Sequence, residues 1–367
     1  MDNLKYWLAF SKIGLIGTKF AQKLWESFGS IKEAWFATNS DLLEIEGLNP
    51  EKIQKFINKK KLVNPDELLE EIYKKNIQVL TLEDKKYPFL LKQIYDPPPI
   101  LFIKGSLDIC NFDMALAIVG SRKASHYILE ILNKIISELK ESNITIISGM
   151  ALGVDSCAHN AAIKNKLKTI AVLGSGLDNI YPKNNIELFK KIIDNNGAVI
   201  SEYYPTESPE LWKFPHRNRI ISGLAQGTLI AEAGLKSGAL ITAKLCLDQN
   251  RELMCIPGLV TNPNTEGTHE LIKEGAGLVT SAKDIFNHLN WQHINYLENN
   301  QDDLKNNLLD NEKKVYEILS LEPIQFDDIL NESRLNIEEL MCVLTSLELR
   351  GIIRQLPGQK YISTFLN

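Results

Sequence analysis

Apolar residues form short continuous runs through the middle of the chain, from about residue 77 to 290. The runs 115–121, 144–149 and 168–176 have the composition of buried strands, and helical segments such as 127–141 separate most of them. Strands that alternate with helices in this way are typical of a parallel sheet covered by helices on both faces. The handedness of such connections favours a doubly wound, Rossmann-like sheet. Further strands are expected at 77–82, 100–105, 198–202, 228–233 and 253–258.

The first 70 residues have a different pattern, with apolar positions at helical spacing. Two glycine-centred turns, at 13–17 and 45–48, each lie between helical segments. This arrangement is typical of helix–hairpin–helix or SAM-like domains, whose turn amides can approach a phosphate backbone. A small helical packing domain would show the same pattern, so both interpretations remain open for residues 1–70.

A polar, Asn- and Asp-rich segment at 296–311 indicates a linker. Three helical segments and two short strands around a Pro-Gly turn follow it, which predicts a winged helix-turn-helix at 312–367. The expected fold class is therefore α/β in three parts. The helical domain occupies 1–70, the Rossmann-like domain 71–295 and the winged helix the C-terminal end.

The third helical segment of this winged helix is acidic. It carries Glu338, Glu339 and Glu348, and Asp and Glu outnumber Lys and Arg over 312–367. A recognition helix for the major groove needs cationic and amide side chains near the phosphates. We therefore expect this domain not to bind DNA strongly and to contact a protein or regulate instead.

The bulk composition narrows the class of protein. With 44% hydrophobic and 24% charged residues, the chain is typical of soluble globular proteins. It has no apolar run of transmembrane length and no signal-peptide pattern at its start, so no membrane partner is expected. Its five cysteines are scattered, which favours reduced thiols and a cytoplasmic location. Because the net charge is −5, nucleic-acid binding would require a local basic patch.

Glycine-containing turns follow several of the predicted strands. Carboxyl ends of parallel strands lie at one edge of a sheet, where helix N-termini direct amides outward, so an anion site is expected there. Neither GxGxxG with a following acidic residue nor GxxxxGK[ST] occurs, so the site suits phosphate groups without a nucleotide cofactor. The turns contain Gly120, Ser121 and Arg122, then Ser148 and Gly149, then Gly174.

The stretch KFPHRNRIISGL (213–224) places Arg217 and Arg219 directly before an apolar run that has a helical pattern. Cations are unfavourable at a helix start unless an anion binds there, and guanidinium groups pair well with phosphate. Phe214 offers a stacking face beside them, as in sites for single-stranded nucleic acid. The alternative is that one of the two arginines pairs with Glu202 or Glu232.

Seven motifs occur in an order that can be compared with known families. They are VGSR (119–122), SGMALGVDSCAH (148–159), LGSGLDNIYP (173–182), ISEYYP (200–205), FPHRNRIISGL (214–224), EAGLKSGALITA (232–243) and IPGLVTNPNTEGTHELIKEGA (256–276). In order and approximate spacing they resemble the motifs of the DNA-processing protein A family, also called DprA or Smf. The resemblance covers the region 77–290, and the terminal parts suit the three-part layout of that family.

The resemblance implies a specific function, which the composition and the motif spacing alone do not indicate. Proteins of this family bind single-stranded DNA with little sequence preference, dimerise through the Rossmann-like domain, and load the RecA recombinase onto DNA taken up in natural transformation. One position departs from the family pattern, because Leu152 stands where many members have an arginine. With the strand-end turns, the motif matches give the candidate DNA-binding residues Gly120, Ser121, Arg122, Ser148, Gly149, Gly174, Lys213, Phe214, Arg217, Asn218, Arg219, Lys236, Ser237 and Gly238.

Parts of the sequence also fit two other functions. Nucleotide phosphoribohydrolases have a similar sheet, and LAQGTLIAEAG (224–234) retains part of their P-G-G-x-G-T-x-x-E loop. The double glycine that would cradle the phosphate is replaced, so we expect no enzyme activity. A transcription regulator is disfavoured by the acidic winged helix. Cys157 and His159 are two residues apart on a predicted helix and face different directions, so no metal or other cofactor is expected.

Overall fold

The computed structural model describes residues 3–14, 18–45, 49–106, 114–140, 142–291, 308–319, 323–349, 352–356 and 358–363. The chain divides into two units, Met1–Leu289 and Asn290–Asn367. Most of the predicted linker at 296–311 lies outside the described residues, as do most of the two glycine-centred turns at 13–17 and 45–48.

The N-terminal part of the first unit is helical. Several of its helices begin at residues whose side chains accept a backbone hydrogen bond, as Ser30, Thr38 and Asn64 do. Such caps satisfy amides that have no partner within the helix. The helices are α1 (Leu4–Ile13), α2 (Thr18–Phe28), α3 (Ile31–Phe36), α4 (Asn39–Leu43), α5 (Pro50–Lys60) and α6 (Pro65–Lys74).

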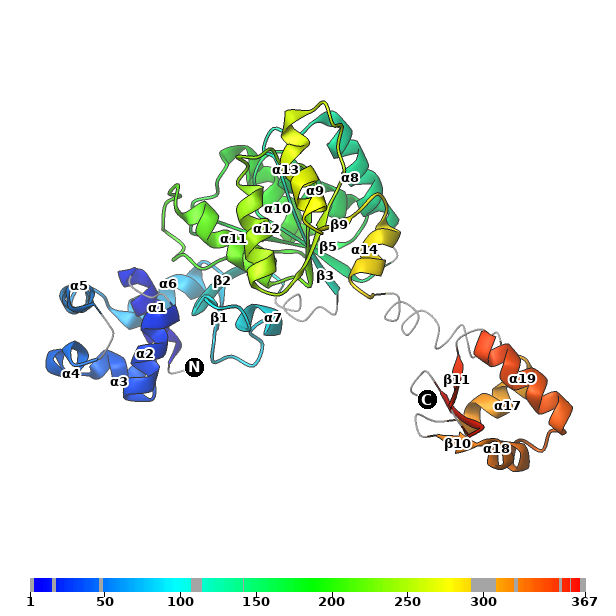
Figure 1. Ribbon diagram of the computed structural model, residues 1–367. Helices are drawn as coiled ribbons and strands as arrows, with labels where there is room; N and C mark the ends of the chain where they lie inside the picture. The colour runs from blue at the N-terminus through cyan, green and yellow to red at the C-terminus, as the bar shows by residue number, and fades with distance from the viewer. Residues whose placement is uncertain are drawn as a thin grey trace. The chain divides into compact units, whose positions relative to one another are not determined.

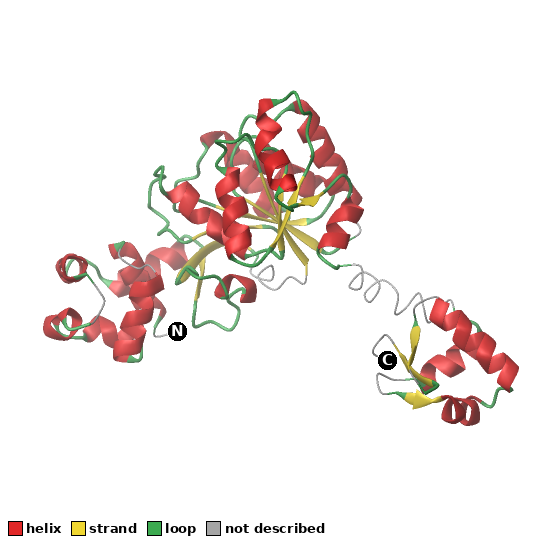
Figure 2. Ribbon diagram, in the orientation of Figure 1, coloured by secondary structure: helices red, strands yellow, loops and turns green. Residues whose placement is uncertain are grey.

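The rest of the first unit is an α/β domain with a nine-stranded sheet (Figures 1 and 2). Its strand order is β1-β2-β6-β5-β4-β3-β7-β8-β9, and the strands from β6 to β9 pair in parallel. A wholly parallel sheet was expected, but β1 pairs antiparallel with β2, and β2 antiparallel with β6. The strands are β1 (Gln78–Thr81), β2 (Ile100–Gly105), β3 (Met114–Val119), β4 (Ile144–Ser148), β5 (Lys168–Val172), β6 (Ala198–Ser201), β7 (Gly227–Ile230), β8 (Glu252–Cys255) and β9 (Gly277–Leu278).

The strand order has a switch point between β3 and β7. From β3 the chain adds β4, β5 and β6 on one side, then returns to add β7, β8 and β9 on the other. This is the arrangement of Rossmann-like folds, which bind ligands at the carboxyl ends of the strands beside the switch point. No described helix has the length and apolar character needed to cross a membrane. The helices of this domain are α7 (Phe89–Lys92), α8 (His126–Glu138), α9 (Val154–Lys164), α10 (Ile186–Asp194), α11 (Lys213–Gly223), α12 (Ala239–Asp248), α13 (Glu266–Lys273) and α14 (Ala282–His288).

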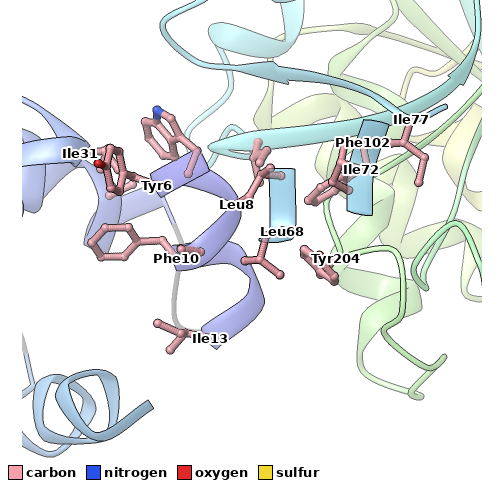
Figure 3. Packing of buried hydrophobic residues seen from close by; sticks show 14 of the residues in the cluster. Tyr6, Leu8, Phe10, Ile13, Ile31, Leu68, Ile72, Ile77, Phe102 and Tyr204 are labelled. Atoms are coloured by element: carbon pink, nitrogen blue, oxygen red, sulfur yellow. The ribbon is translucent and has the colours of Figure 1, made fainter. Parts of the chain in front are cut away.

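Each face of the sheet has its own apolar core, because alternate residues of a strand point to opposite faces. Leu101 and Ile103 of β2 belong to the core that includes Ile220 of α11 and Ala243 of α12. Phe102, between them, belongs to a second core that includes α10. This second core extends without interruption into the N-terminal helices (Figure 3). It contains Tyr6, Leu8, Phe10, Ile13, Ile31, Leu68, Ile72, Ile77 and Tyr204.

Polar contacts join the N-terminal helices to the loops after β5 and β6. Lys75 bridges Glu71 and Asp178, with Nζ–O distances of 2.6 Å to each carboxylate. The Tyr204 hydroxyl donates to Glu71 over 2.8 Å, and the Lys12 ammonium lies 4.2 Å from the centre of the Tyr204 ring. The helical part and the sheet therefore share both a core and a polar seam.

The second unit has a separate core of its own, which includes Val315, Ile329, Leu344 and Tyr361. The described residues of this unit include three helices and a three-stranded sheet in the order β10-β12-β11, which form a winged helix. The elements are α17 (Asp310–Ile318), β10 (Ile324–Gln325), α18 (Phe326–Ser333), α19 (Ile337–Leu349), β11 (Ile353–Leu356) and β12 (Lys360–Ser363).

Candidate nucleic-acid interface

A cavity of about 670 Å³ lies at the switch point of the sheet. The turn after β3 lines one part of it with Gly120, Ser121 and Arg122. The segment after β7 lines another part with residues between Gly234 and Thr242, and α11 contributes Phe214 among others. The cavity is therefore at the sheet edge where the strand-end turns predicted an anion site.

Glu232 holds the turn after β3 in place. Its backbone carbonyl accepts from the Ser121 amide over 2.8 Å, and its buried carboxylate accepts from the amide and hydroxyl of Ser125. Ser125 in turn caps the start of α8. Glu232 thus fixes the position of residues 121–125 and pairs with neither Arg217 nor Arg219.

Helix α11 begins at Lys213, four residues before Arg217, so the two arginines lie inside the helix and not at its start. The expectation that they stand before the helix is wrong. Pro215 is the third residue of α11, a position whose amide needs no partner within the helix, so proline does not prevent the helix from beginning earlier.

Arg219 is one half of a buried ion pair. Its Nη1 and Nη2 donate to the two Glu202 carboxylate oxygens over 2.7 Å each, and its Nε donates to Asp96. The side chains of Arg219 and Glu202 are 8% and 10% exposed. Burial alone would raise the pKa of Glu202, but hydrogen bonds from Arg219 and His216 hold it below its usual value. The sequence left two roles open for Arg219, binding a phosphate or pairing with a carboxylate. In the structure Arg219 pairs with the Glu202 carboxylate.

Arg217 lies beneath the cavity and is also buried. Its Nη1 donates to the carbonyls of Gly149 and Val172, while its Nε has no hydrogen-bond partner among the described residues. Among the described residues, Arg217 has no carboxylate within the 4.0 Å of an ion pair. Burial lowers the pKa of its guanidinium to about 10. A cation in this position favours an anion in the cavity above it.

Gly149 allows that arrangement. A Cβ at position 149 would come within 2.8 Å of both Arg217 Nη2 and Asp155 Oδ2. Burial raises the pKa of Asp155, against the opposing effect of the Arg217 charge. Gly149 therefore contributes by leaving space for a buried cation and carboxyl group, although it does not line the cavity.

Lys213 is not a free cation. Its ammonium lies 2.8 Å from Glu207 and 3.0 Å from Glu210, and 4.8 Å from the centre of the Tyr203 ring. The side chain is 3% exposed. Its ion pairs thus hold the loop after β6 against the start of α11, away from the cavity lining.

The exposed cations of the cavity are Arg122, Lys123 and Lys236. None of them forms an ion pair within the described part of the chain. The Arg122 guanidinium lies 5.8 Å from the centre of the Phe214 ring. These three side chains are the ones available to an anionic ligand in solution.

The structure gathers most of the predicted site residues but not all. Ser148 is buried and donates to the Ile118 carbonyl, and Gly174 packs under Phe214. With Gly149, Lys213 and Arg219, these residues support the cavity without lining it. Lys123 and Tyr181 also line the cavity but were not among the predicted site residues, although Lys123 directly follows the VGSR motif and Tyr181 lies within LGSGLDNIYP. The predicted residues that line the cavity are Gly120, Ser121, Arg122, Phe214, Arg217, Asn218, Lys236, Ser237 and Gly238.

Cys157 and His159 serve the packing of α9. His159 is fully buried and its Nδ1 lies 2.7 Å from the Thr169 hydroxyl. Burial lowers the pKa of His159 to about 3, so the ring is neutral. The described residues hold no cluster of His, Cys, Asp and Glu side chains suited to a metal ion.

His216 should make stability depend on pH. Hydrogen bonds to Asp96 and Glu202 raise its pKa to about 9 from 6.5. A raised pKa contributes stability that is fully present below 6.5 and is lost as the pH rises through about 9. Because the side chain is 40% exposed, solvent screening reduces the expected loss to about 1 kcal/mol.

Urea unfolding at about pH 6 and about pH 9.5 measures this loss. In His216→Gln the pH-dependent part should disappear, while other titrating groups are unchanged. An equal loss of stability in the native chain and in the variant would show that His216 is not responsible.

Comparison with known proteins gives the family. The sequence model described as DNA recombination-mediator protein A matches residues 78–290, and that of the DprA winged helix domain matches 301–359. The chain is 34% identical to Protein Smf of Synechocystis over 97% of this chain and 98% of the relative. It is 46% identical to the DNA processing protein DprA of Streptococcus pneumoniae over 55% of this chain and 71% of the relative.

Solved structures agree with the sequence comparison. The X-ray structure of DNA processing protein A from Streptococcus pneumoniae superposes with a TM-score of 0.68 at 37% identity, covering 77% of this chain and 96% of that one. DNA processing protein A from Helicobacter pylori, whose structure concerns a single-stranded DNA binding mode, gives a TM-score of 0.52 at 31% identity, over 58% and 95% of the two chains. With its Rossmann-like sheet, switch-point cavity and winged helix, the chain belongs to the DprA/Smf family of DNA recombination-mediator proteins.

Proposed function

We propose that the chain binds single-stranded DNA in the switch-point cavity. The observation that carries the proposal is the set of exposed cations, Arg122, Lys123 and Lys236, around the buried Arg217. Phosphate groups would lie near these side chains and the strand-end turn that contains Gly120. The relative from Helicobacter pylori with a described single-stranded DNA binding mode supports this assignment.

A single strand suits the cavity better than a duplex. The site combines cations with the aromatic rings of Phe214 and Tyr181, and a strand with unstacked bases can use both. A duplex keeps its bases stacked inside and would offer mainly its phosphates. The expected preference is therefore for single-stranded DNA, with little dependence on sequence.

We propose binding without cleavage. In the rival hydrolase reading, Glu232 would act on an N-glycosidic bond. Here its carboxylate is fully buried and accepts three hydrogen bonds from Ser125, so it does not face the cavity as a free acid or base. The Gln226 side chain accepts from the Ala115 amide at the opposite end of β3, which gives it a structural contact.

The role in the cell follows from family membership and is part of the proposal. The chain would act in the cytoplasm, protect incoming single-stranded DNA during natural transformation, and load RecA onto it as a homodimer formed through the Rossmann-like domain. Helix α19 has no lysine or arginine between Ile337 and Leu349, which supports a protein contact for the winged helix over DNA binding.

Fluorescence anisotropy with single-stranded and double-stranded oligonucleotides of the same sequence tests the central claim. Binding of the single strand should be tighter and should weaken steeply with salt. Three phosphate contacts correspond to a slope of about −2 in a plot of log K against log salt concentration. A protein without residues 292–367 should bind equally well. Equal affinity for the duplex, or a slope near zero, would contradict the proposal.

A further inference from the structure

Two aromatic rings meet at the wall of the cavity. The centres of the Tyr181 and Phe214 rings are 5.3 Å apart and their planes are tilted by 44°. Both residues line the cavity, Tyr181 from the loop after β5 and Phe214 from the first turn of α11. With the Arg122 guanidinium 5.8 Å from the Phe214 ring, a cation and two rings lie next to one another at the wall.

The two rings differ in how firmly they are held and how much of them solvent reaches. Phe214 is half-buried, and its ring packs against Gly174, where a Cβ would come within 2.7 Å of Phe214 Cδ1. Tyr181 is 45% exposed, and no hydrogen bond of its side chain is present in the described structure. Phe214 therefore supports the pair from below, and Tyr181 presents the accessible face.

The face of an exposed ring cannot hold a phosphate group, and only the Tyr181 hydroxyl could donate to one. Phosphate binding needs donors and positive charge, and Arg122, Lys123, Lys236 and Arg217 supply them. Leaving an aromatic face in water is unfavourable, because burying apolar area is what stabilises such side chains. An accessible ring beside a phosphate site fits a ligand whose flat apolar group lies close to its phosphate, as the base and the phosphate of one nucleotide do.

We propose that Tyr181 is a surface on which a nucleobase of the bound strand stacks, with Phe214 as its support. The inference rests on the proposed function and adds that the cavity recognises bases as well as phosphates. Every base has a π face, so this contact tolerates sequence. The Tyr181 contact should raise affinity for DNA with bases and leave affinity for the bare sugar–phosphate backbone unchanged.

Anisotropy titrations of the full chain with two probes test the inference, one oligothymidylate and one oligonucleotide of the same length built from abasic sites. Tyr181→Ala should weaken oligothymidylate binding about tenfold and leave the affinity for the abasic strand unchanged. Tyr181→Phe and Tyr181→Trp should keep the native affinity for both, because each retains a flat ring. The salt slope of Tyr181→Ala should match that of the native chain, since no phosphate contact is lost.

Tyr127→Ala is the matched control. Tyr127 is 44% exposed on α8 and does not line the cavity, so its removal should change neither titration. An unchanged affinity of Tyr181→Ala for oligothymidylate would overturn the stacking role alone, as would an equal loss on both probes. A native chain that binds neither probe would contradict the proposed function itself, and the stacking role with it.

Discussion

Replacing Arg219 with methionine should lower the free energy of unfolding by about 3 kcal/mol, because it leaves the buried Glu202 carboxylate without its main partner. Affinity of the folded variant for single-stranded DNA should remain native, since Arg219 does not line the cavity. Urea unfolding followed by circular dichroism gives the first quantity, and anisotropy below the unfolding range gives the second.

A pair of further variants separates the ion pair from other effects of the substitution. Glu202→Gln should also destabilise the chain, by removing the charge that Arg219 needs. The double variant Arg219→Met with Glu202→Leu should lose less stability than the two single losses added together, because no buried charge is left alone. The opposite result, native stability of Arg219→Met with weakened DNA binding, would place Arg219 among the phosphate contacts.

Removing the three exposed cations of the cavity together should nearly abolish binding of single-stranded DNA. The variant Arg122→Ala, Lys123→Ala, Lys236→Ala is expected to bind about 100-fold more weakly near 0.1 M salt, with the salt slope reduced by about 2. Stability should be almost unchanged, because these side chains are exposed and form no ion pairs within the described structure.

Net charge alone also affects DNA binding, so the control must change it equally. Lys134, Lys164 and Lys191 are exposed on α8, α9 and α10 and do not line the cavity. Replacing all three with alanine gives the same change in net charge and should cost little affinity. Equal losses in the two triple variants would show a general electrostatic effect instead of a binding site.

The sheet could be predicted because its pattern is local. Continuous apolar runs such as 144–149 alternate with segments whose apolar residues recur at helical spacing. The first pattern predicts a buried strand and the second a helix. The antiparallel pairing of β1 and β2 could not be read in the same way, since an apolar strand carries no mark of its direction. Pairing direction is decided by the connections and the core, which are not local.

The position of the candidate site in the fold could be predicted from the sequence, but the roles of its residues could be predicted only in part. Strand-end glycines and Arg122 lie at the cavity because the carboxyl ends of parallel strands share an edge. Whether an arginine faces the ligand or a carboxylate depends on where its helix begins. Arg217 and Arg219 were expected just before the helix, but α11 begins at Lys213. Arg219 therefore pairs with Glu202, which directly follows β6 and lies 17 positions away in the sequence.

The apolar core shared by the N-terminal helices and the sheet also bears on how the chain comes apart when it unfolds. Phe102 and Tyr204 of the sheet domain are fully buried in the same core as Leu68 and Ile72 of α6. Opening the helices would expose that core, so the helices and the sheet should unfold together in one cooperative step. The winged helix has a separate core, and its unfolding should be a second, independent transition.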